Sequence, residues 1–105
     1  MATQAHVETR RPMLERVRAH APAIREIVER HGATNPRVFG SVARGEEREG
    51  SDVDVLVDNV RLSLLRLVRL EDELASLLGV PVDVVIEAEV PARARPFLMA
   101  KVVPL

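Results

Sequence analysis

Residues 38–58 read VFGSVARGEEREGSDVDVLVD and hold a Gly40-Ser41 pair followed, ten residues later, by the aspartates Asp52 and Asp54. Glycine has no side chain, so a turn at this pair can approach a phosphate closely and direct backbone N–H groups at the anion. Two aspartates at positions i and i+2 of a strand project from the same face, with Cα atoms about 6.8 Å apart. Such a pair suits Mg²⁺, which prefers oxygen ligands and often shares them with substrate phosphates.

The rest of the composition predicts one small domain. The chain has 105 residues, of which 47% are hydrophobic, and it contains two Phe but no Tyr, Trp or Cys. This length fits a single domain over residues 11–105, and residues 1–10 are expected to form a flexible arm. The absence of Cys excludes disulfides, a thiolate nucleophile and cysteine-based zinc sites, and it fits a cytoplasmic protein.

Several classes of protein are not expected from this sequence. The first residues contain no long apolar run, so no signal peptide is expected. No stretch reaches 18 consecutive apolar residues, so no membrane span is expected either. The formal net charge is −1. The strong basic field of a general nucleic-acid binder is therefore missing, and no direct contact with nucleic acid is expected.

The apolar pattern predicts an α/β domain with a small mixed β-sheet flanked by helices, in two or three layers. Pro22 interrupts the first helical pattern and predicts a kink or two helices. A long helix between the second and third strands predicts that those strands are parallel, joined by a right-handed crossover. The expected elements are a kinked or divided helix over 12–30, strands over 37–39, 52–57 and 82–87, and helices over 41–44, 63–78 and 91–103.

The arrangement G-S-x10-D-x-D resembles the signature of the nucleotidyltransferase superfamily that includes DNA polymerase beta. It is most similar to the small minimal nucleotidyltransferases of prokaryotes, which also show an ARG tripeptide (residues 43–45) and a serine before the first aspartate. The resemblance covers residues 14–105, including the terminal segment FLMAKVVPL. It implies the polymerase beta-like nucleotidyltransferase fold and a Mg²⁺-dependent nucleotidyltransferase with ATP as substrate.

Nucleotidyl transfer usually employs two metal ions about 3.5–4 Å apart, which requires three carboxylates in one cleft. Asp83 lies in the apolar run VPVDVVIEA, where burying a lone aspartate is costly unless it is paired or bound to metal. By the resemblance, Asp52 and Asp54 bind both Mg²⁺ ions, and Asp83 binds the catalytic ion and helps to deprotonate the acceptor hydroxyl. An alternative for Asp83 is an edge-strand charge that resists aggregation.

The resemblance also implies a phosphate site. Gly40 and Ser41 would contact the β- and γ-phosphates of the nucleotide, and Arg44 would add a phosphate contact from the first turn of the short helix. An N-cap role is the alternative for Ser41. Two other acidic residues are not expected to belong to the site. Asp58 is expected in a turn, and Glu87 is expected as a solvated charge at the end of a strand.

The acceptor is expected to be another protein. Larger relatives in the superfamily carry a second domain for the acceptor or the base, and this chain also lacks the Tyr and Trp that commonly stack on bases. Minimal nucleotidyltransferases are commonly paired with all-helical HEPN-domain proteins in two-gene toxin–antitoxin modules. The resemblance therefore implies an antitoxin that transfers AMP from ATP to a tyrosine hydroxyl of a HEPN ribonuclease toxin.

An alternative belongs to a different functional class. The chain could be a non-catalytic binding module that masks the toxin by direct contact. The apolar side chains expected in the last helix, Phe97, Leu98, Val102 and Val103, either pack the core or contribute a partner surface. Loss of protection in cells on replacing Asp52 and Asp54 with Asn would favour catalysis over masking.

Overall fold

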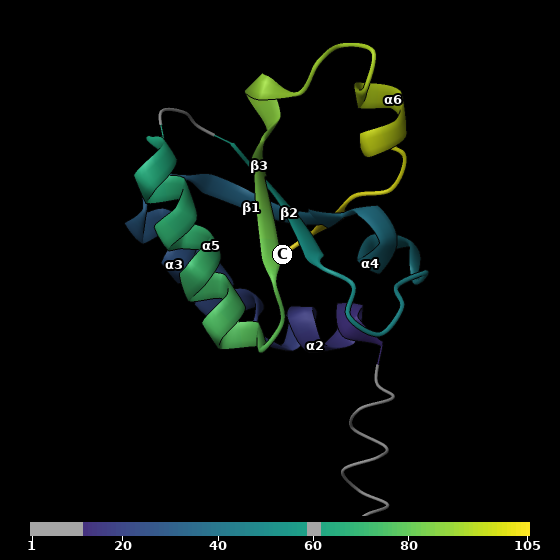
Figure 1. Ribbon diagram of the computed structural model, residues 1–105, viewed down its shortest axis with the longest axis horizontal. Helices are drawn as coiled ribbons and strands as arrows, with labels where there is room; N and C mark the ends of the chain where they lie inside the picture. The colour runs from purple at the N-terminus through teal and green to yellow at the C-terminus, as the bar shows by residue number, and fades with distance from the viewer. Residues whose placement is uncertain (1–11, 59–61) are drawn as a thin grey trace, which may run out of the picture.

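A mixed four-stranded sheet forms the centre of the computed structural model, which describes residues 12–58 and 62–105 (Figure 1). The N-terminal arm expected over residues 1–10 lies outside the described residues. The elements in chain order are α2 (Met13–Ala19), α3 (Ala21–Arg30), β1 (Thr34–Phe39), α4 (Gly40–Arg44), β2 (Val53–Asp58), α5 (Leu64–Leu78), β3 (Val82–Ile86), the 3-10 helix η1 (Glu87–Glu89), α6 (Arg95–Leu98) and β4 (Val103–Pro104).

The sheet has the order β3-β2-β1-β4, with β2 parallel to β3 and antiparallel to β1. The long helix α5 connects the parallel pair, as the sequence predicts. Two register pairs involve aspartates that the sequence singles out. Phe39 of β1 lies opposite Asp54, and Asp54 lies opposite Asp83. The α/β class with a small mixed sheet is therefore confirmed.

Local sequence signals account for most helix boundaries. The first helical region divides into α2 and α3 at His20, and Pro22 lies in the first turn of α3, where its missing N–H costs nothing. The hydroxyl of Ser63 accepts a hydrogen bond from the backbone N–H of Arg66 and caps α5. Gly79 adopts a φ of +76° and ends the same helix.

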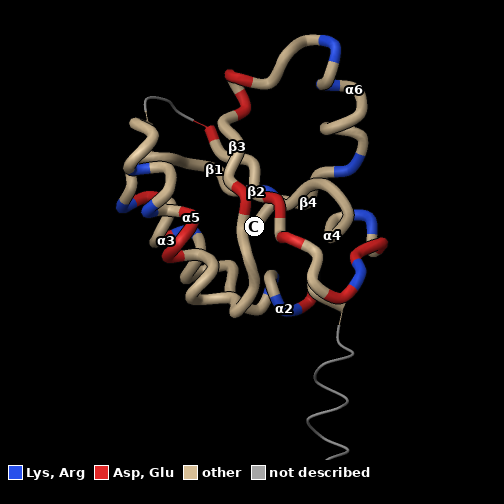
Figure 2. Tube along the Cα trace, in the orientation of Figure 1, with Lys and Arg blue, Asp and Glu red and all other residues tan. Residues whose placement is uncertain are grey.

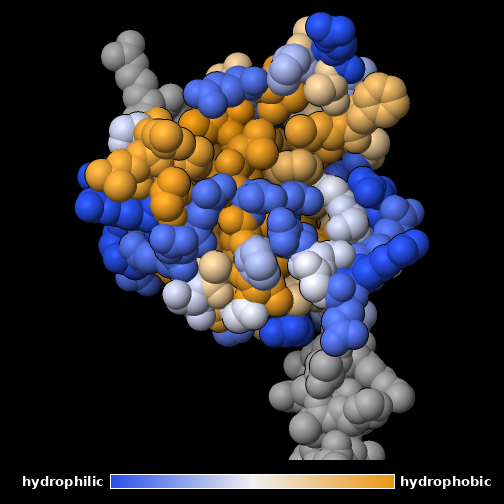
Figure 3. Space-filling model, viewed as in Figure 1, coloured by the Kyte–Doolittle hydropathy of each residue, from blue (hydrophilic) through white to orange (hydrophobic). Residues whose placement is uncertain are grey.

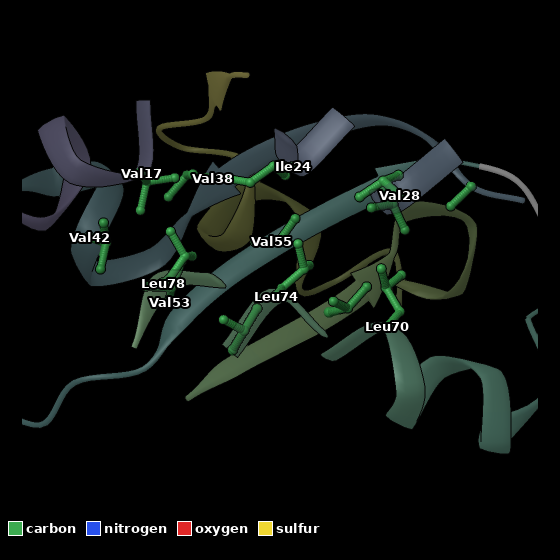
Figure 4. Close-up of a cluster of buried hydrophobic side chains, with 14 of the residues drawn as sticks. Val17, Ile24, Val28, Val38, Val42, Val53, Val55, Leu70, Leu74 and Leu78 are labelled. Atoms are coloured by element: carbon green, nitrogen blue, oxygen red, sulfur yellow. The ribbon is translucent and has the colours of Figure 1, made fainter. Parts of the chain in front are cut away.

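The two faces of the sheet bury different clusters. Val53, Val55 and Val57 of β2 pack with residues of α3 and α5, which cover one face (Figure 4). Because side chains alternate along a strand, Asp54 and Leu56 point to the opposite face. There Leu56 joins a smaller cluster with residues of α6. The carboxylates thus lie on the face of the sheet that α3 and α5 leave uncovered.

The expected last helix over residues 91–103 is wrong. Only Arg95–Leu98 is α-helical, and Val103–Pro104 forms the strand β4, antiparallel to β1. An unpaired edge of β1 would leave backbone groups without partners, and β-branched residues such as Val103 favour a strand. Pairing along β1 therefore outweighs continuation of the helix. Within the two described segments, no helix is long and apolar enough to cross a membrane.

A buried arginine joins two strands and the 3-10 helix η1 on the uncovered face. Arg37 of β1 is 6% exposed and forms ion pairs with Asp58 of β2, at 3.1 Å, and Glu87 of η1, at 2.6 Å. A hydrogen bond from Asn35, followed by the hydrogen bond and charge of Arg37, lowers the pKa of Asp58. The expectations for the two acids are corrected here: Asp58 belongs to β2, and Glu87 is half-buried in an ion pair, because each neutralises the buried guanidinium.

Replacing Arg37 with Ala is expected to lower the free energy of unfolding by about 2 kcal/mol at pH 7. Breaking a buried ion pair costs about 3–5 kcal/mol, and the figure is reduced here because both acids keep contact with water. Since the pKa of Asp58 is lowered in the folded state, its contribution is present above its ordinary pKa and fades as the pH falls below about 4. Urea unfolding at several pH values measures both effects.

The exposed Arg18 of α2 supplies the control for this measurement. Arg18→Ala removes the same side chain from the surface and should change stability by no more than about 0.5 kcal/mol. Equal losses in the two variants would contradict the structural role assigned to Arg37.

Candidate active site

Three aspartates meet where β2 and β3 begin. Asp52 immediately precedes β2, Asp54 is the second residue of that strand, and Asp83 lies directly opposite Asp54 on β3. Asp54 is half-buried, whereas Asp52 and Asp83 are exposed. Acidic positions accordingly mark both neighbouring strands near the middle of the molecule (Figure 2). The structure thus brings together the three carboxylates that the sequence identifies.

Mutual repulsion and burial perturb this cluster. Desolvation, followed by the charges of Asp83 and Asp52, raises the pKa of Asp54 above its ordinary value. Desolvation and then the neighbouring Asp52 likewise raise the pKa of Asp83. Like charges held on adjacent strands destabilise the fold, so their placement suits a function that needs a cation or a proton acceptor there.

Gly40 allows the turn after β1 to lie against the carboxylate of Asp54. Its φ is +74°, and a Cβ atom at this position would collide with Oδ2 of Asp54. Both the backbone conformation and the space therefore require glycine. The first backbone groups of α4 follow directly, which places the turn predicted to contact phosphate beside the carboxylates.

Ser41 and Arg44 lie on α4, the helix that begins at Gly40. Phe39 is the N-cap of this helix, so the alternative interpretation of Ser41 as an N-cap is wrong. The positive charge of Arg44 opposes the rise in the pKa of Asp54. Arg44 is exposed, and its Nε donates to Glu46 Oε1 at 2.8 Å. A phosphate could therefore be reached by the outer guanidinium nitrogens without breaking this pair.

A contact that the sequence does not signal holds β3 in place. β3 is an edge strand, and the backbone N–H of Val84 donates to Glu71 Oε2 of α5 at 2.8 Å. A charged acceptor makes this a comparatively strong hydrogen bond. Because Val84 follows Asp83, Glu71 fixes the backbone next to the third carboxylate. Helical periodicity marks Glu71 only as a polar position on α5, so sequence reasoning missed it.

The donor set fits a divalent cation such as Mg²⁺. Asp52, Asp54 and Asp83 supply the carboxylate oxygens that hard cations prefer, and a bound cation would offset the repulsion described above. Among the described residues, no three acidic or histidine side chains form a preformed metal cage. The three aspartates therefore lie on or directly before adjoining strands, but their side chains would have to rearrange to hold an ion.

Comparisons with known proteins agree with this geometry. The family model described as nucleotidyltransferase domain matches residues 22–103. The protein adenylyltransferase MntA of Thermococcus cleftensis is 48% identical over 65 residues, which cover 61% of this chain and 66% of that protein. The chain thus matches slightly less than two thirds of this relative's length.

Solved structures give the same result for the fold. A candidate minimal nucleotidyltransferase is 46% identical, with a TM-score of 0.75, and the match covers 88% of this chain and 95% of that one. The complex of a tri-AMPylated Shewanella oneidensis HEPN toxin with its MNT antitoxin matches with a TM-score of 0.64 at 18% identity, covering 83% of this chain and 69% of that one. The second match shows the fold alone. Sequence and structure together establish that this chain belongs to the nucleotidyltransferase family and has the fold of its minimal members.

Proposed function

We propose that this chain is a Mg²⁺-dependent protein adenylyltransferase that acts as an antitoxin. It transfers AMP from ATP to a tyrosine hydroxyl of a HEPN-domain ribonuclease toxin. The observation that carries the proposal is the alignment of Asp54 with Asp83, against the glycine turn at Gly40. The names of the Thermococcus relative and of the Shewanella complex support the choice of acceptor class.

The proposed reaction forms one bond and breaks another. The acceptor hydroxyl oxygen attacks the α-phosphorus of ATP, the bond from that phosphorus to the bridging oxygen of the β-phosphate breaks, and pyrophosphate leaves. Bound Mg²⁺ would stabilise the charge on the attacking and leaving oxygens. Gly40, Ser41 and Arg44 hold the β- and γ-phosphates, so that the leaving group departs away from the acceptor.

The carboxylates have separate roles in this proposal. Asp52 and Asp54 would both hold the Mg²⁺ ions, and Asp83 would help to hold the catalytic one. Asp83 also takes the hydroxyl proton as the new phosphodiester bond forms. Its pKa is raised by desolvation and by Asp52, and a higher pKa makes a carboxylate a better proton acceptor near neutral pH.

Masking of the toxin by contact alone is the second candidate. An exposed aromatic side chain favours it, because Phe97 is 80% exposed. Exposed apolar surface of this kind marks protein interfaces. The two candidates share a partner and differ in whether the carboxylates do chemistry.

Intact-mass analysis of the candidate HEPN partner, after incubation with this chain and ATP, tests the proposal. A gain of one or more AMP units is expected with Mg²⁺, and none when EDTA removes the metal. If the partner is inhibited in a tight complex without any gain in mass, the result supports masking by contact and contradicts AMP transfer.

A further inference from the structure

The short helix α6 packs on the uncovered face of the sheet and forms a wall beside the strands that carry the carboxylates. Leu98 and Met99 pack against Phe39 and Leu56. Phe39 is the register partner of Asp54, and Leu56 lies two residues farther along the same strand. Two strand residues span about 6.8 Å, so the end of α6 packs on β2 about 6.8 Å along the strand from Asp54. A macromolecule that presents a hydroxyl to Asp54 and Asp83 must therefore approach α6.

Phe97 projects from this wall into solvent. Its neighbour Leu98 is half-buried in the cluster, whereas Phe97 is 80% exposed. The chain has only two Phe and no Tyr or Trp, so one of its two aromatic side chains is left outside the core. Apolar surface continues from α6 across the upper part of this face (Figure 3). Aromatic side chains at such positions are commonly the residues that bind a protein partner.

Among its charged side chains, the segment that contains α6 carries only basic ones. Residues 91–101 contain Arg93, Arg95 and Lys101 and no acidic residue. Arg95 contacts Glu87 at 3.5 Å, while Arg93 and Lys101 are exposed. Figure 2 shows basic positions along the segment around α6 and acidic positions on β2 and β3. The wall thus consists of an aromatic ring within a basic rim.

We infer that Phe97, with Arg93 and Lys101 beside it, docks the acceptor protein and brings its hydroxyl to the carboxylates. This inference rests on the proposed adenylyl transfer. The acceptor surface that fits is an apolar pocket with acidic groups at its edge, near the hydroxyl that receives AMP. Complementary charges steer the encounter, and the ring inserted in the pocket slows dissociation.

The exposure of Phe97 favours a protein partner over the adenine base of ATP. An aromatic ring that binds a base usually lines a groove, whereas Phe97 is 80% exposed to solvent. An exposed aromatic side chain contributes most to the binding free energy when a partner protein buries it fully. Base stacking and self-association are therefore alternatives that the test must separate from docking.

Binding is measured first, without ATP, by titration calorimetry of the full chain with its candidate HEPN partner. Phe97→Ala is expected to raise the Kd at least about tenfold, as for a binding hot spot. Arg93→Gln is expected to weaken binding most at low salt. Leu64→Ala removes an apolar side chain of similar exposure from α5 and should leave the Kd unchanged.

AMP transfer and nucleotide binding are measured on the same variants. Phe97→Ala should raise the KM for the acceptor and preserve kcat at saturating acceptor, with unchanged affinity for Mg²⁺ and a non-hydrolysable ATP analogue. An unchanged acceptor Kd, or equal losses in Phe97→Ala and Leu64→Ala, would overturn the inference. Weakened binding of the ATP analogue by Phe97→Ala would also overturn it, because that result indicates base stacking. So would ultracentrifugation that shows a self-associated wild type and a monomeric Phe97→Ala variant.

The failure of docking and the failure of the proposed chemistry give different results. A wild type that binds the acceptor but adds no AMP overturns the transfer reaction, and the calorimetric comparison still decides the role of Phe97. A wild type that transfers AMP while Phe97→Ala binds equally well overturns the docking surface alone. A wild type that does not bind the acceptor overturns the assignment of Phe97.

Discussion

Asp54→Asn is expected to abolish AMP transfer and, in the same protein, to increase the stability of the metal-free fold. The amide keeps the shape of the carboxyl but removes the charge that would hold the proposed Mg²⁺ ions. The loss of transfer should exceed the roughly 10–100-fold that follows from changing an outer partner of a metal site. Intact-mass analysis of the acceptor over time measures it, with Asp52→Asn expected to behave alike.

The gain in stability follows from the pKa of Asp54. Burial, then Asp83 and Asp52, raise this pKa in the folded state, so the ionised side chain is less favourable in the fold than in the unfolded chain. Wild type therefore loses stability as the pH rises through the raised pKa, and the Asn variant does not. The variant should be more stable by about 0.5–1 kcal/mol at pH 7, and equal to wild type below about pH 4.

Two controls make the prediction specific. Asp72→Asn makes the same chemical change on an exposed position of α5 and should alter neither transfer nor stability. EDTA during unfolding removes any cation that would hide the repulsion. If Asp54→Asn still protects cells from the toxin although transfer is lost, masking by contact explains the antitoxin. If the variant keeps full transfer, Asp54 is not a metal ligand.

Local signals made the site predictable from sequence. The two aspartates at i and i+2, the glycine turn before them and the lone aspartate in a later apolar strand each depend on neighbours in the chain. The parallel crossover then follows from one long helix, and it places Asp83 beside Asp54. The sequence pattern therefore predicts which acidic residues lie on adjoining strands, whereas their roles in catalysis stay predictions.

The features that sequence reasoning missed depend on distant partners. Residues 102–105 contain apolar residues that suit a helix or a strand, and the open edge of β1 decides between them, as when Leu105 N–H donates to the carbonyl of Pro36. In the sequence Arg37 is one charged residue among many, and only the fold brings Asp58 and Glu87 into ion pairs with it. In each case the deciding interaction joins residues that are far apart in the chain.

Gly40→Ala is expected to reduce AMP transfer far more than it reduces stability. At a φ of +74° any side chain is strained, at a cost of about 1–2 kcal/mol. The added Cβ would also collide with Oδ2 of Asp54 and lie 3.2 Å from its Cγ. A carboxylate at the end of a side chain yields more easily than the backbone, so the collision displaces the carboxylate of Asp54 and leaves the fold largely intact. A displacement of about 1 Å can lower a rate about 100-fold.

Gly79→Ala separates the two contributions. Gly79 has a nearly identical φ of +76°, at the end of α5, and a Cβ there would meet none of the described atoms within 4 Å. Both variants should therefore lose similar free energy of unfolding in urea, because the backbone strain is the same. Only Gly40→Ala should lose AMP transfer, together with affinity for Mg²⁺ and a non-hydrolysable ATP analogue. Equal activity in the two variants would mean that the turn at Gly40 is needed for the fold and not for holding Asp54 in position.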